Sequence, residues 1–350
     1  MSLLWFDHET EFQDLVDTSF QYEHDDNPDY FSDMSKRVQD IIYRDTKYNI
    51  DFLYTSYVLN DDKIMNDYAA WLFHLMFSVL PKNREETARY VNNHFEYIKK
   101  AIVDVISPEK HDALIRLLDE AKQAVLKEAE SGEIFLGGNS RYEAQIEQYM
   151  DSLSKKNMKQ SIYLIQQFIK DGISINDIYV EILAESMRRI GELWHTARIS
   201  VDQEHYSTTV TQMAMAQMYP LLFSNENRKD KTMLCACPGT ELHEMGARMV
   251  SDLFENDGWD TIYLGAAVPE HAMLQAITSD RPDLICLSVT MPQHLIACHE
   301  LILAIREQFP EAKIAVGGKA FESTHDLWKQ WPVDIYARDA RELLKKANNI

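Results

Sequence analysis

The last third of the chain constrains its fold most, because short apolar runs alternate there with longer helical segments. Five runs rich in apolar and β-branched residues have the length of buried strands, and ten or more residues with helical periodicity separate them. The runs cover residues 232–237, 261–264, 284–289, 313–316 and 333–336. This alternation predicts an α/β domain over residues 230–350, built on a doubly wound parallel sheet of the flavodoxin-like kind.

Four helical segments are predicted immediately before the sheet. They cover residues 142–153, 156–171, 175–196 and 201–222. Asp171 and Gly172 are suitable for ending the second helix, Ser174 for capping the third, and Ser200 or Asp202 for beginning the fourth. Four amphipathic helices with short loops predict a small bundle over residues 141–224.

Residues 1–128 place apolar side chains at helical spacing, with one break near Pro81, and therefore predict an all-helical N-terminal domain. A glycine-containing stretch around Gly132 and Gly137 is expected to be a linker. The formal net charge is −21, and residues 1–50 hold twelve acids against four Lys or Arg. Because phosphate binding depends on clustered Lys and Arg, we expect no direct DNA binding.

No apolar run reaches the roughly 20 residues that a membrane-spanning helix needs. The N-terminus also lacks the basic region and small-residue cleavage site of a secretory signal. We therefore expect a cytoplasmic protein without a membrane partner. The four cysteines lie in the last third, and we interpret them as buried reduced thiols rather than zinc ligands.

The loop after the first predicted strand, residues 238–246, contains a histidine where doubly wound sheets bind ligands. Glu241 precedes His243 by two residues, and its carboxylate is placed to accept the second ring N–H, as partners of metal-bound histidines do. Gly246 permits close approach of the backbone. On these residues alone, a surface ion pair is the commoner interpretation.

Two further motifs follow the third and fourth predicted strands. Ser288-Val289-Thr290 begins 41 intervening residues after Gly246, and Gly317-Gly318 begins 26 intervening residues after Thr290. With the Glu-x-His-x-x-Gly loop, this pattern resembles the cobalamin-binding domains of methionine synthase, the corrinoid methyl carriers and the B12 mutases. The resemblance spans the whole C-terminal domain.

The resemblance implies a cobalamin cofactor whose nucleotide tail leaves cobalt and enters a slot in the sheet. His243 would then be the lower cobalt ligand, Glu241 its hydrogen-bond partner and Gly246 a point of close approach. The positions that would line the slot are Ser288, Thr290, Gly317 and Gly318. The chain departs from the family at Glu241, where Asp is usual.

The predicted bundle resembles the helical cap over the upper face of cobalamin. Trp194-His195 ends its third helix, and Glu204-His205 begins its fourth. A Trp, nine residues and Glu-His resemble the adenosyl pocket of the adenosylcobalamin photoreceptors that regulate carotenoid genes. In that family a histidine directly after the Trp binds cobalt once light has removed the adenosyl group, and His195 matches it. The alternatives are a core Trp194, a first-turn acid at Glu204 and a solvated pair of histidines.

The N-terminal region departs from those regulators, because it has no winged helix-turn-helix and no basic recognition helix. It distantly resembles the globin-like helical modules of bacterial stress signalling, and related modules hold a bilin in some B12 photoreceptors. Biliverdin is thus implied as a second cofactor, although no motif fixes it. His74 is the most ligand-like residue of the region, and a core or partly exposed histidine is the commoner interpretation.

These patterns together predict an adenosylcobalamin-binding light sensor that signals to a protein partner. We expect a homo-oligomer and no enzyme, since no catalytic acid, base or nucleophile group stands outside the cofactor site. The alternative is a corrinoid methyl carrier of a B12-dependent methyltransferase system. A storage or delivery module is a third interpretation, which leaves His195 without a role.

Overall fold

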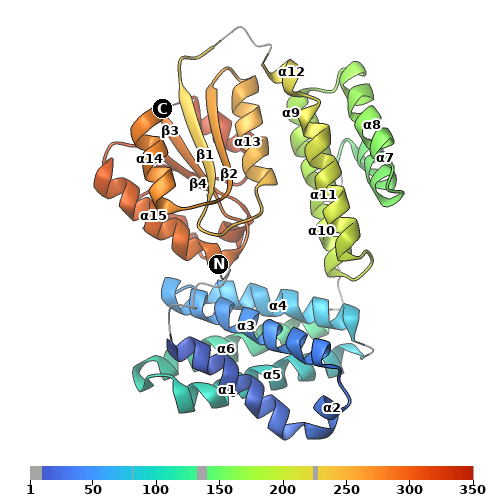
Figure 1. Cartoon of the computed structure of the whole chain (residues 1–350), viewed down its shortest axis with the longest axis vertical. Helices are drawn as coiled ribbons and strands as arrows, with labels where there is room; N and C mark the ends of the chain where they lie inside the picture. Colours follow the sequence, from blue (N-terminus) through green and yellow to red (C-terminus); the bar gives the residue numbers. More distant parts are fainter. Residues whose placement is uncertain (1–9, 81, 132–139, 224–227, 350) are drawn as a thin grey trace. The chain divides into compact units, whose positions relative to one another are not determined.

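The computed structural model describes residues 10–80, 82–131, 140–223 and 228–349 (Figure 1). Its contacts divide the chain into two compact units. The first unit runs to Glu133 and includes Met291–Ile296 and Ala320–Leu327, and the second holds the rest of the chain. The glycine-containing linker expected around Gly132 and Gly137 lies outside the described residues.

The N-terminal region is helical, as its periodicity predicts. Its described helices are α1 (Thr10–Asp26), α2 (Pro28–Ser32), α3 (Lys36–Leu59), α4 (Asp62–Val79), α5 (Arg84–Val105) and α6 (Pro108–Ser131). Short side chains set the boundaries, since Asp61 caps α4 and Asn83 forms a capping box with Glu86 at α5. Buried Leu53, Phe73 and other apolar residues form the core between the helices.

The predicted four-helix bundle is present, with two differences. Its elements are α7 (Glu143–Ser154), α8 (Met158–Lys170), α9 (Ile175–Asp177), the π-helical turn η2 (Ile178–Leu183), α10 (Ala184–His195), α11 (Val201–Ala216) and α12 (Tyr219–Leu222). The third helix is interrupted by η2. The fourth was expected to reach residue 222 but ends at Ala216, because Pro220 has no N–H to donate to the carbonyl of Ala216.

Capping residues were expected at three helix ends of the bundle, and two of them adopt the expected capping geometry. Gly172 takes the left-handed conformation (φ 83°) after α8, and the Ser174 hydroxyl accepts a hydrogen bond from the Asp177 N–H at the start of α9. Ser200 occupies the N-cap position of α11, but its side chain makes no capping hydrogen bond.

The C-terminal domain is the predicted doubly wound sheet. Its strands are β1 (Thr232–Pro238), β2 (Asp260–Val268), β3 (Leu284–Ser288), β4 (Ile314–Gly317) and β5 (Ile335–Ala337). All pairs are parallel in the order β2-β1-β3-β4-β5, so the order reverses between β1 and β3. Helix α13 (Met245–Asn256) covers one face, and α14 (Glu270–Asp280) and α15 (Leu295–Gln308) cover the other (Figure 1).

All four cysteines are free and buried in the sheet domain. In the part of the chain that the structure describes, no helix is long and apolar enough to cross a membrane.

The bundle and the sheet share one apolar core, which includes Met249 and Leu253 of α13 beside bundle residues. Polar contacts surround this core. The Tyr179 hydroxyl of η2 donates to Asp252 of α13 at 2.7 Å, and Arg248 Nε donates to the Tyr219 hydroxyl at 3.0 Å. The cap is therefore attached to α13, the helix that follows the His243 loop.

Asp252 predicts a pH dependence of stability. Burial raises its pKa from 3.8 to about 6, against the opposing effect of the hydrogen bond from Tyr179. An acid with a raised pKa holds its proton more tightly in the folded chain, so the free energy of unfolding falls as pH rises between about 4 and 6. Asp252→Asn should remove this decline and stabilise the protein at pH 7.5 by roughly 2 kcal/mol.

Urea unfolding of parent and variant at pH 4.5, 6 and 7.5 measures the effect. Asp260→Asn, which removes an exposed acid at the start of β2, is the control. The same decline in parent and Asp252→Asn would contradict the assignment.

Candidate cofactor site

His243 lies in the loop between the end of β1 and the start of α13, at the carboxyl edge of the sheet. Backbone hydrogen bonds fix this loop to the end of β2. The Gly239 N–H donates to the Val268 carbonyl at 3.1 Å, and the Ala267 N–H donates to the Glu241 carbonyl at 2.9 Å. The loop therefore has a defined conformation before any ligand is considered.

The Glu241 carboxylate is fully buried and bridges two loops. Its Oε1 accepts the His243 backbone N–H at 2.8 Å and lies 2.6 Å from His243 Nδ1, while its Oε2 accepts the Thr290 N–H at 2.8 Å. The predicted contact of Glu241 with His243 is thus present. The longer arm of Glu, where the family usually has Asp, also reaches the loop after β3.

This arrangement determines which nitrogen of His243 faces outward. Because Nδ1 contacts Glu241, Nε2 is the atom available to a metal, and the side chain is 57 % exposed. The hydrogen bond to Glu241 raises the pKa of His243, burial opposes this, and the charges of Glu241 and Glu204 add to it.

Small residues form a row across the carboxyl ends of three neighbouring strands. Ser288 of β3 is in register with Gly317 of β4, which is in register with Ala337 of β5. At Gly318 the backbone is left-handed (φ 101°), and a Cβ there would lie 2.2 Å from the Val289 carbonyl oxygen. Ala337 was missed by the sequence reasoning, because its alignment with Gly317 depends on strand register.

Gly246, in the first turn of α13, has no packing reason within the described chain to be glycine. A Cβ there would meet no atom within 4 Å, and its φ is not in the left-handed region. The open space suits a bound group that approaches this turn closely. The outward Nε2 of His243 is suited to bind cobalt, and the row of small residues leaves space for a nucleotide tail. The residues present therefore fit a cobalamin.

The four cap residues lie around the turn between α10 and α11. Trp194 is 38 % exposed at the end of α10, and His195 beside it is half-buried. Glu204 Oε2 contacts Nδ1 of the exposed His205 at 2.5 Å. Ala197 in the turn has a left-handed φ of 52°, which is unusual for a residue with a Cβ.

Glu244 also supports the site, although the sequence reasoning did not select it. Its Oε2 accepts the Ala266 N–H and the Tyr263 hydroxyl at 3.1 Å, and its Oε1 lies 3.5 Å from Gln212 Nε2 of α11. Glu244 therefore connects the His243 loop both to β2 and to the cap. Its place directly after the histidine was the available signal.

His74 pairs with an acidic side chain of a neighbouring helix. Its Nε2 lies 2.9 Å from Glu128 Oε2, and both side chains are partly buried between α4 and α6. This matches the commoner interpretation, a partly exposed histidine.

Residues 231–345 match the B12 binding domain, and residues 145–219 match a second family of the same description. The two regions are B12-binding domains. The two matches cover the sheet domain and the helical bundle. Nothing in these matches supports biliverdin in residues 1–128.

Two curated relatives have different roles. The HTH-type transcriptional repressor CarH of Myxococcus xanthus is 27 % identical over 157 residues, which cover 45 % of this chain and 52 % of that protein. The monomethylamine corrinoid protein 1 of Methanosarcina acetivorans is 24 % identical over 215 residues, which cover 57 % of this chain and 94 % of that protein. The chain thus spans about half the length of the first relative.

Among solved structures, the Methanosarcina barkeri monomethylamine corrinoid protein has the same fold over 59 % of this chain and 99 % of its own, with a TM-score of 0.53 and 20 % identity. At this identity the likeness establishes only the fold of the cap and sheet.

The bridging role of Glu241 yields a prediction that needs no cofactor. Glu241→Ala would leave the buried donors of His243 and Thr290 without their acceptor, so it should lower the free energy of unfolding by about 2 kcal/mol or more. Urea unfolding of the cofactor-free protein measures this. Leu242→Ala, at the neighbouring exposed position, is the matched control and should change stability by less than about 0.5 kcal/mol. Equal effects of the two substitutions would contradict the bridge.

Proposed function

We propose that the chain is a light sensor that binds adenosylcobalamin between its cap and its sheet domain and signals to a protein partner. The observation that carries the proposal is the contact between α11 and the His243 loop, in which Gln212 Nε2 lies 3.5 Å from Oε1 of Glu244, the residue after His243. Because Glu204 and His205 lie on the same helix as Gln212, this contact supports a single site for the cap residues and the proposed cobalt ligand.

The sheet domain holds the lower face in this proposal. His243 Nε2 is the lower cobalt ligand, and Glu241 fixes the orientation of the ring through Nδ1. The row of small residues at the ends of β3, β4 and β5 accommodates the nucleotide tail. Gly246 permits the corrin to approach the first turn of α13.

The cap recognises the upper ligand. Trp194 supplies a flat apolar wall, and the Glu204 carboxylate accepts hydrogen bonds from ribose hydroxyl groups. His205 contacts Glu204 and restricts its orientation. Adenosylcobalamin supplies a cobalt–carbon bond that visible light breaks.

Selectivity for the adenosyl group tests this pocket. The parent protein should bind adenosylcobalamin at least tenfold more tightly than methylcobalamin, and Trp194→Ala should reduce that ratio roughly tenfold by removing the apolar wall. Titration in the dark, followed by absorption, gives both affinities. Tyr163→Ala, an exposed aromatic of α8, is the control. Equal affinities in the parent protein would favour a methyl carrier.

His195 is the proposed switch residue. It directly precedes the turn that contains the left-handed Ala197, and a change of that strained backbone would reorient the imidazole. We propose that His195 becomes the upper cobalt ligand after light has removed the adenosyl group. That bond would tie the cap to the sheet domain in a new arrangement.

Illumination tests the switch. Green light should give the parent protein an absorption spectrum with nitrogen on both faces of cobalt, and His195→Ala should give a spectrum with water on the upper face. The elution volume of the parent on size-exclusion chromatography should change with light, and that of the variant should change less. His271→Ala, an exposed histidine of α14, is the control. Identical photoproducts in parent and His195→Ala would refute the role.

A corrinoid methyl carrier is the second candidate. The similarity to a monomethylamine corrinoid protein over 94 % of that protein's length favours it. A carrier must leave the upper face accessible to a methyltransferase, so Trp194 and Glu204 would then have no ligand to recognise. Absence of adenosyl selectivity and of any light response would favour this function.

We also propose that the protein is a homo-oligomer and not an enzyme. Residues 1–128 contact a protein partner rather than DNA in this proposal. The acidic character of this region supports the proposal, because residues 1–50 hold three times as many acids as Lys and Arg.

A further inference from the structure

Two segments of the sheet domain belong, by their contacts, to the N-terminal unit. Met291–Ile296 follows Ser288-Val289-Thr290 directly, and Ala320–Leu327 follows Gly317-Gly318 after one intervening residue. These are the chain segments that leave the two proposed tail-binding motifs. The N-terminal helices therefore contact the segments that follow the two tail-binding motifs in the sequence.

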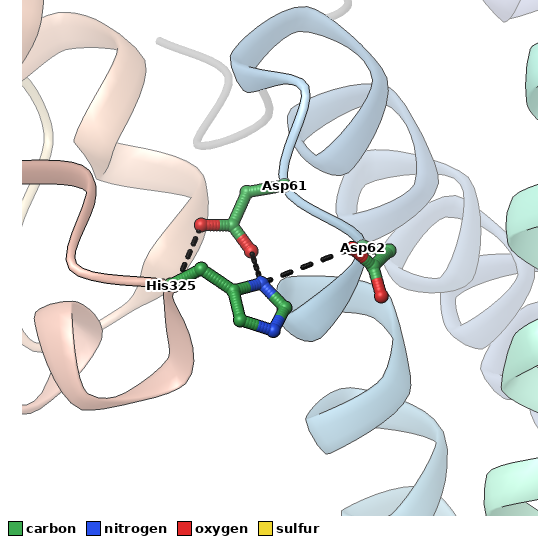
Figure 2. A group of neighbouring side chains, drawn as sticks. All are labelled: Asp61, Asp62 and His325. Carbon is green, nitrogen blue, oxygen red and sulfur yellow. Dashed lines mark hydrogen bonds and ion pairs between the residues drawn. The ribbon is translucent and has the colours of Figure 1, made fainter. Parts of the chain in front are cut away.

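Asp61 makes the central contact with the second segment. Its side chain is almost completely buried at the start of α4. One carboxylate oxygen accepts the His325 backbone N–H at 2.7 Å, and the other lies 3.0 Å from His325 Nδ1 (Figure 2). Lys63 Nζ donates to the Glu322 carbonyl at 2.6 Å. Residues 322 and 325 are thus held by two side chains from one helix start.

Both sides of this contact are locally fixed. The Asp61 carbonyl accepts the Ser56 hydroxyl at 2.5 Å, and its N–H donates to the Ser56 carbonyl at 3.0 Å. In the segment, the Thr324 hydroxyl donates to the Phe321 carbonyl at 2.8 Å. A short, hydrogen-bonded segment transmits a displacement of its first residues rather than absorbing it.

Gly318 connects residues 320–327 to the tail slot through a tightly packed backbone. Its backbone packs so closely against Val289 that a Cβ would lie 2.2 Å from that residue's carbonyl oxygen. A group that enters between the β3 and β4 ends therefore lies directly against the Gly317-Gly318 turn, and only residue 319 separates this turn from Ala320–Leu327.

We propose that Asp61, Lys63 and His325 form a latch through which the N-terminal helices sense the nucleotide tail of the cofactor. The latch holds residues 320–327 in the position that keeps the slot open for the tail. The inference rests on the tail slot of the proposed function, but not on the adenosyl group or on light. Asp61, Asp62 and His325 also resemble a small cation site, yet His325 already occupies both Asp61 oxygens.

The test compares hydroxocobalamin with cobinamide, the corrinoid that lacks the nucleotide tail, in the dark with the full chain. Three variants weaken the latch. His325→Ala removes the ring contact, Lys63→Met removes the contact with Glu322, and Asp61→Ser cannot reach His325 but retains a residue suited to capping α4. Lys36→Met is the control. Lys36 is an exposed lysine of α3 that pairs only with its helical neighbour Asp40 among the ion pairs of the described residues.

Each latch variant should bind hydroxocobalamin roughly three- to tenfold more weakly and cobinamide within twofold of the parent. By reciprocal linkage, hydroxocobalamin should slow hydrogen exchange of the peptide containing residues 61–64 in the parent, cobinamide should not, and the effect should be lost in Asp61→Ser. Unchanged hydroxocobalamin affinity, or equal weakening for both corrinoids, would overturn the latch.

The result is distinguishable from failure of the proposed function. Loss of adenosyl selectivity or of the light response leaves these dark measurements intact. A parent protein that binds neither corrinoid would overturn both proposals.

Discussion

The buried carboxylate of Glu241 is the interaction on which the site depends. A charge inside a protein is costly unless hydrogen bonds compensate it, and Glu241 contacts two nitrogens of His243 and the backbone N–H of Thr290. The loops after β1 and β3 flank the point where strand order reverses, and this one side chain holds both. Position and orientation of His243 follow from it.

The sequence predicted the sheet well because parallel strands covered on both faces are continuous apolar runs that periodicity detects. It predicted β2 too short, ending at residue 264, since the carboxyl half contains register shifts beside Gly265 and a left-handed Ala267. It also missed η2, because six residues are too few for apolar spacing to separate a π-helical turn from an α-helix. Local irregularities near the site were thus the hardest features to predict.

Motif spacing predicted the contact of Glu241 with His243, because both residues lie in one short loop. Contacts between residues far apart in the sequence were not predictable. Asp61 and His325 are 264 positions apart, and neither belongs to a pattern that suggests the other. Ala337 lines up with Gly317 only through strand register, which a single sequence does not specify.

Glu241 also suggests how the two faces of the cofactor communicate in the proposed sensor. An upper-face change that reorients His243 acts on Glu241, and Glu241 holds Thr290 at 2.8 Å. The next residue, Met291, begins a segment that belongs to the N-terminal unit. In the proposed sensor, a change at His243 would therefore reach Met291 through one carboxylate and one peptide bond. The tail slot reaches the same helices through residues 320–327, so both routes end on the acidic N-terminal region.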